Sequence, residues 1–230
     1  GVAFRFWYPL PLILLSYKEL GYLIPRIHPH DMDRQLAAID SRLFGVNPEV
    51  IFARLQSPAL TLPLQLSYLC YYVFPVALGI LLWRQRRFLS LQFLIFVILL
   101  GFYISYIGYI AVPAIGPRFF LSTTGIPPIS GHIVGSIRKS LDSMEGLTRD
   151  CFPSGHTELT LLILFTARRF HRRFFWIMLV PALMLIFATM YLQYHYVIDV
   201  VAGAILAAII VLAANWLHAA LGGRKLTALD

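Results

Sequence analysis

Long stretches without charged residues dominate the pattern of polar and apolar positions along this chain. Four such stretches cover residues 55–83, 88–117, 174–198 and 200–223. Each is long enough to cross a hydrocarbon core of about 30 Å as an α-helix. The pattern therefore predicts four membrane-spanning helices.

Two further spans are predicted from weaker patterns. Residues 6–24 are apolar but carry Lys18 and Glu19, and residues 159–167 are too short unless their helix begins near Ser154. Because no linker or internal repeat interrupts the sequence, we expect one domain over residues 1–230, an all-α polytopic membrane protein with six transmembrane helices in one bundle. The expected spans are roughly 6–24, 58–83, 88–112, 154–168, 174–193 and 197–221, with long loops at 25–57 and 113–153.

The composition agrees with a membrane protein, since 59% of the residues are hydrophobic and 13% are charged. Short loops rich in arginine and lysine mark the cytoplasmic side of such proteins. The loops 84–87 and 168–173 contain seven arginines and no acidic residue. We therefore expect these loops and both termini in the cytoplasm, and loops 25–57 and 113–153 on the extracytoplasmic side. The net charge of +8 then comes mostly from the inside loops and does not indicate a nucleic-acid partner.

Two segments on the expected outer side have contrasting patterns. Residues 31–55 alternate charged and apolar positions at roughly helical spacing, which predicts an amphipathic helix that packs on the outer surface. Residues 113–153 are rich in Pro, Gly and Ser, which predicts an irregular loop. Cys70 lies within a predicted span and Cys151 outside it, so we expect no disulfide between them and find no metal-binding cysteine spacing.

Three polar motifs fall at the ends of predicted spans on this outer side. They are Gly-Pro-Arg at 116–118, Pro-Ser-Gly-His-Thr at 153–157, and His195 with Asp199. Ionisable residues in membrane spans are rare and usually face a cavity or a partner. Because the topology was derived from other residues, the common side of these motifs is independent support for one shared site.

The residue types in these motifs suit phosphoryl chemistry. Ser154 is a favoured N-cap and Gly155 lets a ligand approach the backbone, so this helix start can bind a phosphate group. His195 and Asp199 are four residues apart, so the carboxylate can accept a hydrogen bond from one imidazole nitrogen and leave the other nucleophilic. The remaining roles are those of a general acid and of a ligand for phosphoryl oxygens, which suit His156 and Arg118.

Other interpretations of these residues stay open. Ser154 can be a simple helix cap, and the spacing of His195 and Asp199 recurs by chance in long sequences. A metal site built from His156, His195 and Asp199 is a further alternative, although it leaves Arg118 unexplained. We expect no metal and no cofactor.

The Pro-Ser-Gly-His motif at 153–156, followed by His195 and Asp199, resembles two signatures of the type 2 phosphatidic acid phosphatase superfamily, which includes vanadium haloperoxidases. Residues 189–199 are similar to the branch that contains inositol phosphorylceramide synthases and sphingomyelin synthases. The resemblance covers residues from about 113 to 203. It implies a fold of the same type and an enzyme of lipid metabolism.

The resemblance also implies a mechanism. Phosphoryl transfer would be independent of metal and pass through a phosphohistidine on His195, with Asp199 orienting it and His156 acting as acid and then as base. The residues implied to hold the phosphate are Arg118, Ser154 and Gly155. Glu158 is a second-tier residue that can cap the helix or orient His156.

The chain departs from the superfamily where its phosphatases carry two further cations. Ala111 stands where those phosphatases usually have a lysine, and Ala188 and Thr189 stand where they have a Ser-Arg pair. A phosphate monoester carries close to two negative charges at neutral pH, whereas a diester carries one, so a site with one assured arginine is better balanced for a diester. Candidate replacements for the missing cations are Lys18, Arg138, Lys139 and Arg149.

We therefore expect an integral-membrane lipid phosphotransferase that moves a phospho-head group from a phospholipid diester to a hydroxyl acceptor. One alternative is a lipid phosphate or polyprenyl diphosphate phosphatase of the same superfamily, with water as the acceptor. Another is a non-enzymatic transporter or scaffold in which the two histidines and Asp199 form a proton relay or a structural network. The expected partners are membrane lipids, and the sequence leaves the donor, the acceptor and the oligomeric state open.

Overall fold

The computed structural model describes residues 7–121 and 147–222. Throughout these two ranges the regular structure is helical, as predicted. The helices are α2 (Pro9–Ile27), α3 (Asp33–Phe44), α4 (Pro48–Arg54), α5 (Pro58–Arg84), α6 (Phe88–Ala111), α7 (Pro117–Phe120), α9 (Gly155–Phe170), α10 (Arg172–Tyr191) and α11 (Val197–Ala220). Two of the candidate replacement cations, Arg138 and Lys139, lie outside the described residues.

Four helices are long and apolar enough to cross a membrane, namely α5, α6, α10 and α11. They coincide with four of the predicted spans. Helices α2 and α9 also form where spans were expected, but α2 carries Lys18, Glu19 and Arg26, and α9 has only 16 residues. The count of six spans therefore remains a prediction.

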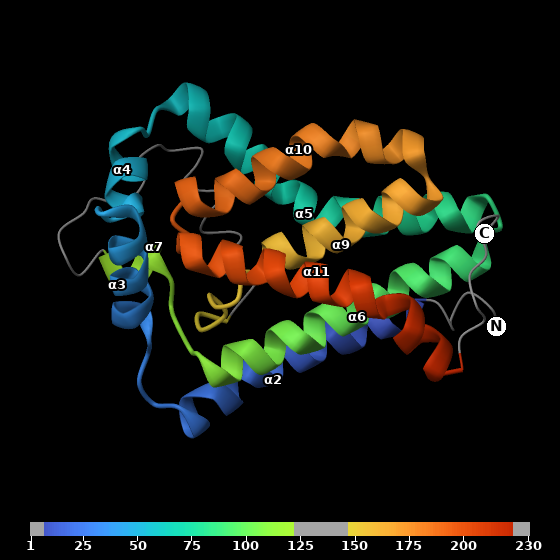
Figure 1. The fold of residues 1–230 in the computed structure, drawn as a ribbon, viewed down its shortest axis with the longest axis horizontal. Coiled ribbons are helices and arrows are strands. Elements are labelled where there is room, and N and C mark those ends of the chain that lie inside the picture. The colour runs from blue at the N-terminus through green and yellow to red at the C-terminus, as the bar shows by residue number, and fades with distance from the viewer. Residues whose placement is uncertain (1–6, 122–146, 223–230) are drawn as a thin grey trace.

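Helix α9 lies inside the bundle, where it packs against α5, α6, α10 and α11 (Figure 1). Of its 16 residues, 11 are buried. A helix that buries most of its circumference needs apolar or internally bonded side chains on nearly every side. Thr166 meets this condition because its hydroxyl donates to the Leu162 carbonyl at 2.8 Å. A short central helix can therefore carry polar groups into the protein interior.

The outward faces of the long helices are apolar. Large hydrophobic residues exposed on α5, α10 and α11 include Val73, Trp176, Ile177, Val180, Val201, Ile205, Leu212 and Trp216. Proteins surrounded by water rarely expose apolar surface on this scale. Contact with lipid explains this surface, and the chain is a membrane protein.

Three shorter helices cover one end of the bundle. Figure 1 shows α3, α4 and α7 together at the end where α9 and α11 begin. Helix α3 lies within residues 31–55, where an amphipathic helix was expected, and one of its faces is buried. That face contains Asp33, Leu36, Ala37 and Asp40. The spacing i, i+3, i+4, i+7 places these four residues on one side of a helix, so two carboxylates enter the interior.

The two arginine-rich loops meet at the opposite end of α9. Arg87 donates a hydrogen bond to the carbonyl of Phe170, and Gln85 Nε2 lies 3.2 Å from His171 Nε2. Helix α9 begins at the covered end and finishes at Phe170. Its full length therefore separates the positive loops from the residues around its start.

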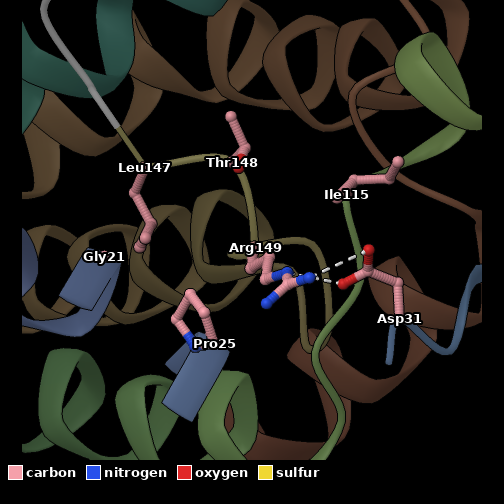
Figure 2. Close-up of a pocket in the computed structure, with 7 residues that line it drawn as sticks. All are labelled: Gly21, Pro25, Asp31, Ile115, Leu147, Thr148 and Arg149. Atoms are coloured by element: carbon pink, nitrogen blue, oxygen red, sulfur yellow. Dashed lines mark hydrogen bonds and ion pairs between the residues drawn. The ribbon is translucent and has the colours of Figure 1, made fainter. Parts of the chain in front are cut away.

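A cavity of about 290 Å³ lies between α2 and the segment 147–149 (Figure 2). Arg149 lines this cavity and forms an ion pair with Asp31, with Nε 2.6 Å from Oδ1. The same guanidinium lies 3.3 Å from the carbonyl oxygen of Pro29. Ile115 lines this cavity and also a smaller one, which contains the residues of the candidate site.

Candidate active site

A narrow cavity brings together one residue from each of the three sequence motifs. Arg118, His156 and His195 all line it. The other lining residues are Tyr68, Ile115, Asp150, Cys151 and Tyr194. Its volume of about 10 Å³ is close to that of a single water-sized sphere, so a substrate has to widen it.

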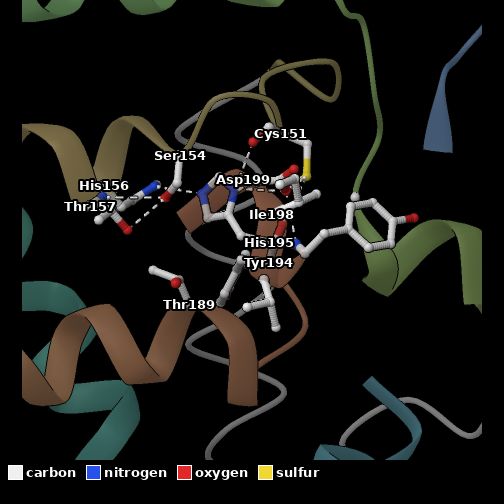
Figure 3. A network of polar contacts seen from close by, with 12 residues as sticks. Cys151, Ser154, His156, Thr157, Thr189, Tyr194, His195, Ile198 and Asp199 are labelled. Carbon is white, nitrogen blue, oxygen red and sulfur yellow. Dashed lines mark hydrogen bonds and ion pairs between the residues drawn. The ribbon is translucent and has the colours of Figure 1, made fainter. Parts of the chain in front are cut away.

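His195 is oriented through its Nδ1 atom. Nδ1 lies 2.8 Å from the backbone carbonyl oxygen of Cys151, which can only accept a hydrogen bond. The proton of a neutral His195 therefore sits on Nδ1, and Nε2 keeps a free lone pair. Nε2 faces His156, whose Nδ1 lies 3.3 Å away (Figure 3). This is the arrangement that a nucleophile next to a proton donor requires.

Asp199 lies next to His195 without making the hydrogen bond expected from their spacing. Its Oδ2 is 3.6 Å from His195 Nδ1. Oδ2 instead accepts from the Cys151 thiol at 2.9 Å and from the Tyr196 backbone N–H at 2.8 Å. Nδ1 of His195 donates its hydrogen bond to the Cys151 carbonyl, whereas the carboxylate of Asp199 lies beside the imidazole and holds the Cys151 thiol and the Tyr196 backbone.

Cys151 is a site residue that none of the sequence motifs indicated. Its carbonyl orients His195 and its thiol donates to Asp199. Burial, followed by the charge of Asp199, raises the pKa of the thiol well above its ordinary value. The thiol therefore stays protonated, as a donor must. Its place two residues before the Pro153 motif is the only sequence signal for this role.

Ser154 caps α9 as predicted from its residue type. Its Oγ accepts from the Thr157 backbone N–H at 3.3 Å and from the Thr157 hydroxyl at 3.1 Å. A Cβ atom on Gly155 would lie 2.4 Å from the Tyr109 hydroxyl, and one on Gly203 would lie 2.4 Å from the Ser154 carbonyl oxygen. The absence of side chains at both glycines is therefore required by packing. A role of Ser154 and Gly155 in holding phosphate stays a prediction.

Arg118 reaches the cavity from the short helix α7. Gly116, at the N-cap of α7, has φ +83°, and a Cβ there would lie 2.8 Å from the Tyr194 carbonyl oxygen. The Arg118 backbone N–H donates to the Gln193 carbonyl at 2.9 Å. Its guanidinium lies over the rings of Tyr194 and Phe119, 4.6 Å from each centroid. The chain next to His195 thus fixes both the backbone and the side chain of Arg118.

Two tyrosines of α5, neither of them predicted as a site residue, surround His156. The Tyr68 ring stacks on His156 at 4.7 Å between centroids, and the Tyr71 ring lies at 4.3 Å. Tyr68 also stacks on Tyr194 at 4.5 Å. Two tyrosines three residues apart in a span share one helix face, which was the available signal.

The structure separates the three second-tier residues from this cavity. Glu158 is buried and accepts a hydrogen bond from Ser105 of α6, so it neither caps α9 nor bonds to His156 in the described part of the chain. Lys18 is exposed on α2. Arg149 is held by Asp31 in the larger cavity. Neither Lys18 nor Arg149 therefore lines this cavity in the place of a missing cation.

Thr189, which stands where the second cation is missing, and its neighbour Ala188 have structural roles. The Thr189 carbonyl accepts from the backbone N–H groups of Tyr194 and His195, at 2.8 and 3.0 Å. Ala188 is fully buried in the core around Tyr68. Among the described residues that line the cavity, Arg118 is the one permanent cation, and Asp150 is a carboxylate.

The expected alternative of a metal bound by both histidines and Asp199 does not fit the geometry. Asp199 faces Nδ1 of His195, whereas His156 faces Nε2. A metal ion bound to either nitrogen of His195 would therefore be next to Asp199 or next to His156, but not both. A different set of three potential ligands, Cys151, His195 and Asp199, lies within 4.8 Å. Those atoms already share hydrogen bonds among themselves and with the Cys151 carbonyl.

Fold and cavity together describe a helical membrane protein with a histidine pair and an arginine at one end of its bundle. A model of the PAP2 superfamily matches residues 34–213, and the chain belongs to this superfamily. The matched range includes every residue of the cavity. Comparison with curated proteins gave no significant match, and comparison with solved structures gave none either. Membership of the superfamily indicates a phosphatase or phosphotransferase type of lipid enzyme.

Proposed function

We propose that this protein is a lipid phosphotransferase that acts through a phosphohistidine on His195. The observation that carries the proposal is the cavity shared by Arg118, His156 and His195, with Nδ1 of His195 bonded to a carbonyl. That bond leaves Nε2 as a nucleophile that faces a second imidazole. Arg118 supplies a guanidinium that can bind two phosphoryl oxygens at once.

The first displacement releases diacylglycerol from the donor lipid. Nε2 of His195 attacks phosphorus, an N–P bond forms, and the P–O bond to the diacylglycerol breaks. Protonated His156 gives its proton to the departing oxygen, and the phospho-head group stays on His195. Arg118 balances the charge that develops on the phosphoryl oxygens.

The second displacement returns the histidines to their starting state. The acceptor hydroxyl loses its proton to His156 and its oxygen attacks phosphorus. The N–P bond then breaks, and its electron pair returns to Nε2. Neither displacement uses a metal or a cofactor.

The charge of the cavity favours a phosphodiester over a monoester. Arg118 is accompanied by the carboxylate of Asp150, so the described lining offers little net positive charge. A dianionic monoester would lack a second cation, whereas a monoanionic diester matches one arginine. The preference for a transferase over a phosphatase depends on this balance.

The substrates are expected to enter from the membrane. The exposed apolar faces of α5, α10 and α11 provide contact with lipid close to α9. The arginine-rich loops at the far end of α9 favour a cytoplasmic location for that end. The cavity would then face the extracytoplasmic side, near the outer leaflet.

Trapping of the intermediate tests the proposal. Purified protein would be given phosphatidylcholine or phosphatidylinositol labelled at phosphorus, with no acceptor, and the protein-bound label would be measured after rapid quenching. A phosphoramidate is stable in base and labile in acid, so its stability identifies the residue type. We expect label on the wild type and on His30→Ala, whose histidine is exposed on the outer loop, and none on His195→Ala.

Other outcomes select the alternatives. Rapid release of inorganic phosphate from phosphatidic acid without an alcohol acceptor would favour a phosphatase. If His195→Ala fails to fold, and the wild type takes up no label from any donor lipid, the results would favour a scaffold or transporter.

A further inference from the structure

Helix α3 carries two carboxylates on its buried face. Asp33 is 2% exposed and Asp40 is fully buried. They lie seven residues apart, so both point to the same side of the helix, two turns apart. Burial of an ionised carboxylate is unfavourable unless several donors satisfy it. The partners of these two groups therefore indicate what α3 does.

Asp33 holds the turn that precedes Arg118. Its Oδ2 accepts from the Ile115 backbone N–H at 2.9 Å, and its Oδ1 accepts from the Gly116 backbone N–H at 2.8 Å. The Tyr196 hydroxyl also donates to Oδ1, at 3.0 Å. One carboxylate thus connects the backbone of the arginine turn to the residue after His195.

Asp40 holds the start of α11. Its Oδ2 accepts from the Val197 backbone N–H at 2.6 Å and its Oδ1 from the Ile198 backbone N–H at 2.9 Å. These groups belong to the first turn of the helix, where backbone N–H groups have no partner within the helix. A carboxylate is favoured at this position by its charge as well as by its lone pairs. His195 lies two residues before Val197.

We infer that Asp33 and Asp40 are positioning residues of the active site, with Asp33 setting the arginine turn and Asp40 setting the histidine turn. The inference rests on the proposed function, since it assigns these residues to the reaction of His195 and Arg118. Both anchors lie on one rigid helix, so α3 fixes the separation of two segments that are about 80 residues apart in sequence. Helix α3 therefore sets the distance between Arg118, which binds the phosphate, and the nucleophile His195.

The bonding pattern specifies aspartate at both positions. Each carboxylate receives backbone N–H groups on both of its oxygens. Asparagine has nearly the same shape but one acceptor and one donor, so its amide would face a backbone N–H. Asp33→Asn and Asp40→Asn therefore break one contact each while they preserve volume.

The experiment compares these two variants with two controls on the same helix. Arg34→Gln removes one charge from an exposed position, and Leu36→Val trims the buried face between the two aspartates. Tyr196→Phe is a further variant, because it removes one of three donors to Asp33 and leaves the ring in place. The readouts are hydrogen exchange of peptides covering 113–121 and 194–200, and release of acyl-labelled diacylglycerol from phosphatidylcholine or phosphatidylinositol vesicles.

We expect local effects that differ between the two aspartates. Asp33→Asn should accelerate exchange of the Ile115 and Gly116 amides at least tenfold and raise KM about ten- to hundredfold, because Arg118 binds the phosphate in the ground state as well. Asp40→Asn should accelerate exchange at Val197 and Ile198 and lower kcat by a similar factor. Tyr196→Phe should raise KM severalfold.

The controls separate positioning from general stability. Arg34→Gln should leave exchange and kinetics unchanged, and Leu36→Val should lower the unfolding temperature without selective exchange in either peptide. Wild-type exchange and kinetics in both asparagine variants would overturn the inference. So would a uniform acceleration of exchange that Leu36→Val reproduces. If the wild type releases no diacylglycerol from either lipid, the proposed function fails, and the exchange patterns still decide whether α3 holds the two turns.

Discussion

His156 Nδ1 and His195 Nε2 lie 3.3 Å apart in a cavity of about 10 Å³. A phosphoryl group cannot enter without moving one of the rings. His195 is held at Nδ1 by the Cys151 carbonyl, whereas Nε2 of His156 has no hydrogen-bond partner in the described residues. Substrate binding is therefore expected to displace His156 along its stacking partners Tyr68 and Tyr71, and to leave the nucleophile in place.

Replacement of His156 tests its role as proton donor. His156→Ala should lower kcat for a phospholipid diester by about 10²- to 10⁴-fold, because the diacylglycerol oxygen leaves poorly without a proton. An aryl phosphodiester with a 4-nitrophenolate leaving group needs little protonation, so its turnover should fall less than tenfold. The ratio of the two rates is the measurement, with His30→Ala as a control. Equal losses for both donors would contradict the assignment.

Gly203 is expected to be essential for the packing of α11 against the start of α9. A methyl group there would lie 2.4 Å from the Ser154 carbonyl oxygen, which is backbone and cannot rotate away. Gly203→Ala should therefore destabilise the protein by about 1–3 kcal/mol. Gly21→Ala on α2 is the matched control, since its added Cβ would meet its nearest neighbour at 3.6 Å. Thermal unfolding in detergent should show a lower midpoint for the first variant and an unchanged or higher one for the second.

Glu49 is expected to make stability depend on pH. Burial, with the nearby charges of Asp40 and Asp199 adding to it, raises the pKa of this carboxyl group to about 8 from 4.5. Between these values the folded protein binds more protons than the unfolded chain, so stability is highest below pH 4.5 and falls as pH rises towards 8. Glu49→Gln removes this contribution.

Unfolding temperatures of Glu49→Gln and wild type should therefore diverge as pH rises from 5 to 8, with the variant becoming the more stable. Glu19→Gln, at an exposed position on α2, should follow the wild type at every pH. Parallel curves for Glu49→Gln and wild type would show that Glu49 ionises freely in the fold.

Removal of metal ions should leave activity intact. A metal ion next to Asp199 would need a lone pair on Nδ1 of His195. This nitrogen carries the hydrogen that is donated to the Cys151 carbonyl, so it has no lone pair to offer. Diacylglycerol release should thus stay within twofold after dialysis against a strong chelator. A large loss, restored by zinc, would point instead to the group formed by Cys151, His195 and Asp199.

Much of the fold was predictable because it depends on local patterns. The apolar stretches correspond to α5, α6, α10 and α11, and the helix expected to begin near Ser154 begins at Gly155 with Ser154 as its cap. A packed amphipathic helix was predicted over residues 31–55, but the burial of Asp33 and Asp40 was not, although the spacing of Asp33, Leu36, Ala37 and Asp40 was visible. Its charged residues resemble those of a surface helix until the partners of the carboxylates are known.

The sequence by itself determined that the chain enters a membrane and that Arg118, His156 and His195 fall at one end of the helical bundle, because hydropathy, loop charge and helix starts are properties of neighbouring residues. Only the tertiary structure decided which group orients His195, where Arg149 pairs and what α3 holds. Those contacts join Cys151 to His195, Asp31 to Arg149, and Asp40 to Val197. Each depends on how distant segments pack, and no local pattern specifies the partner that a buried polar group will find.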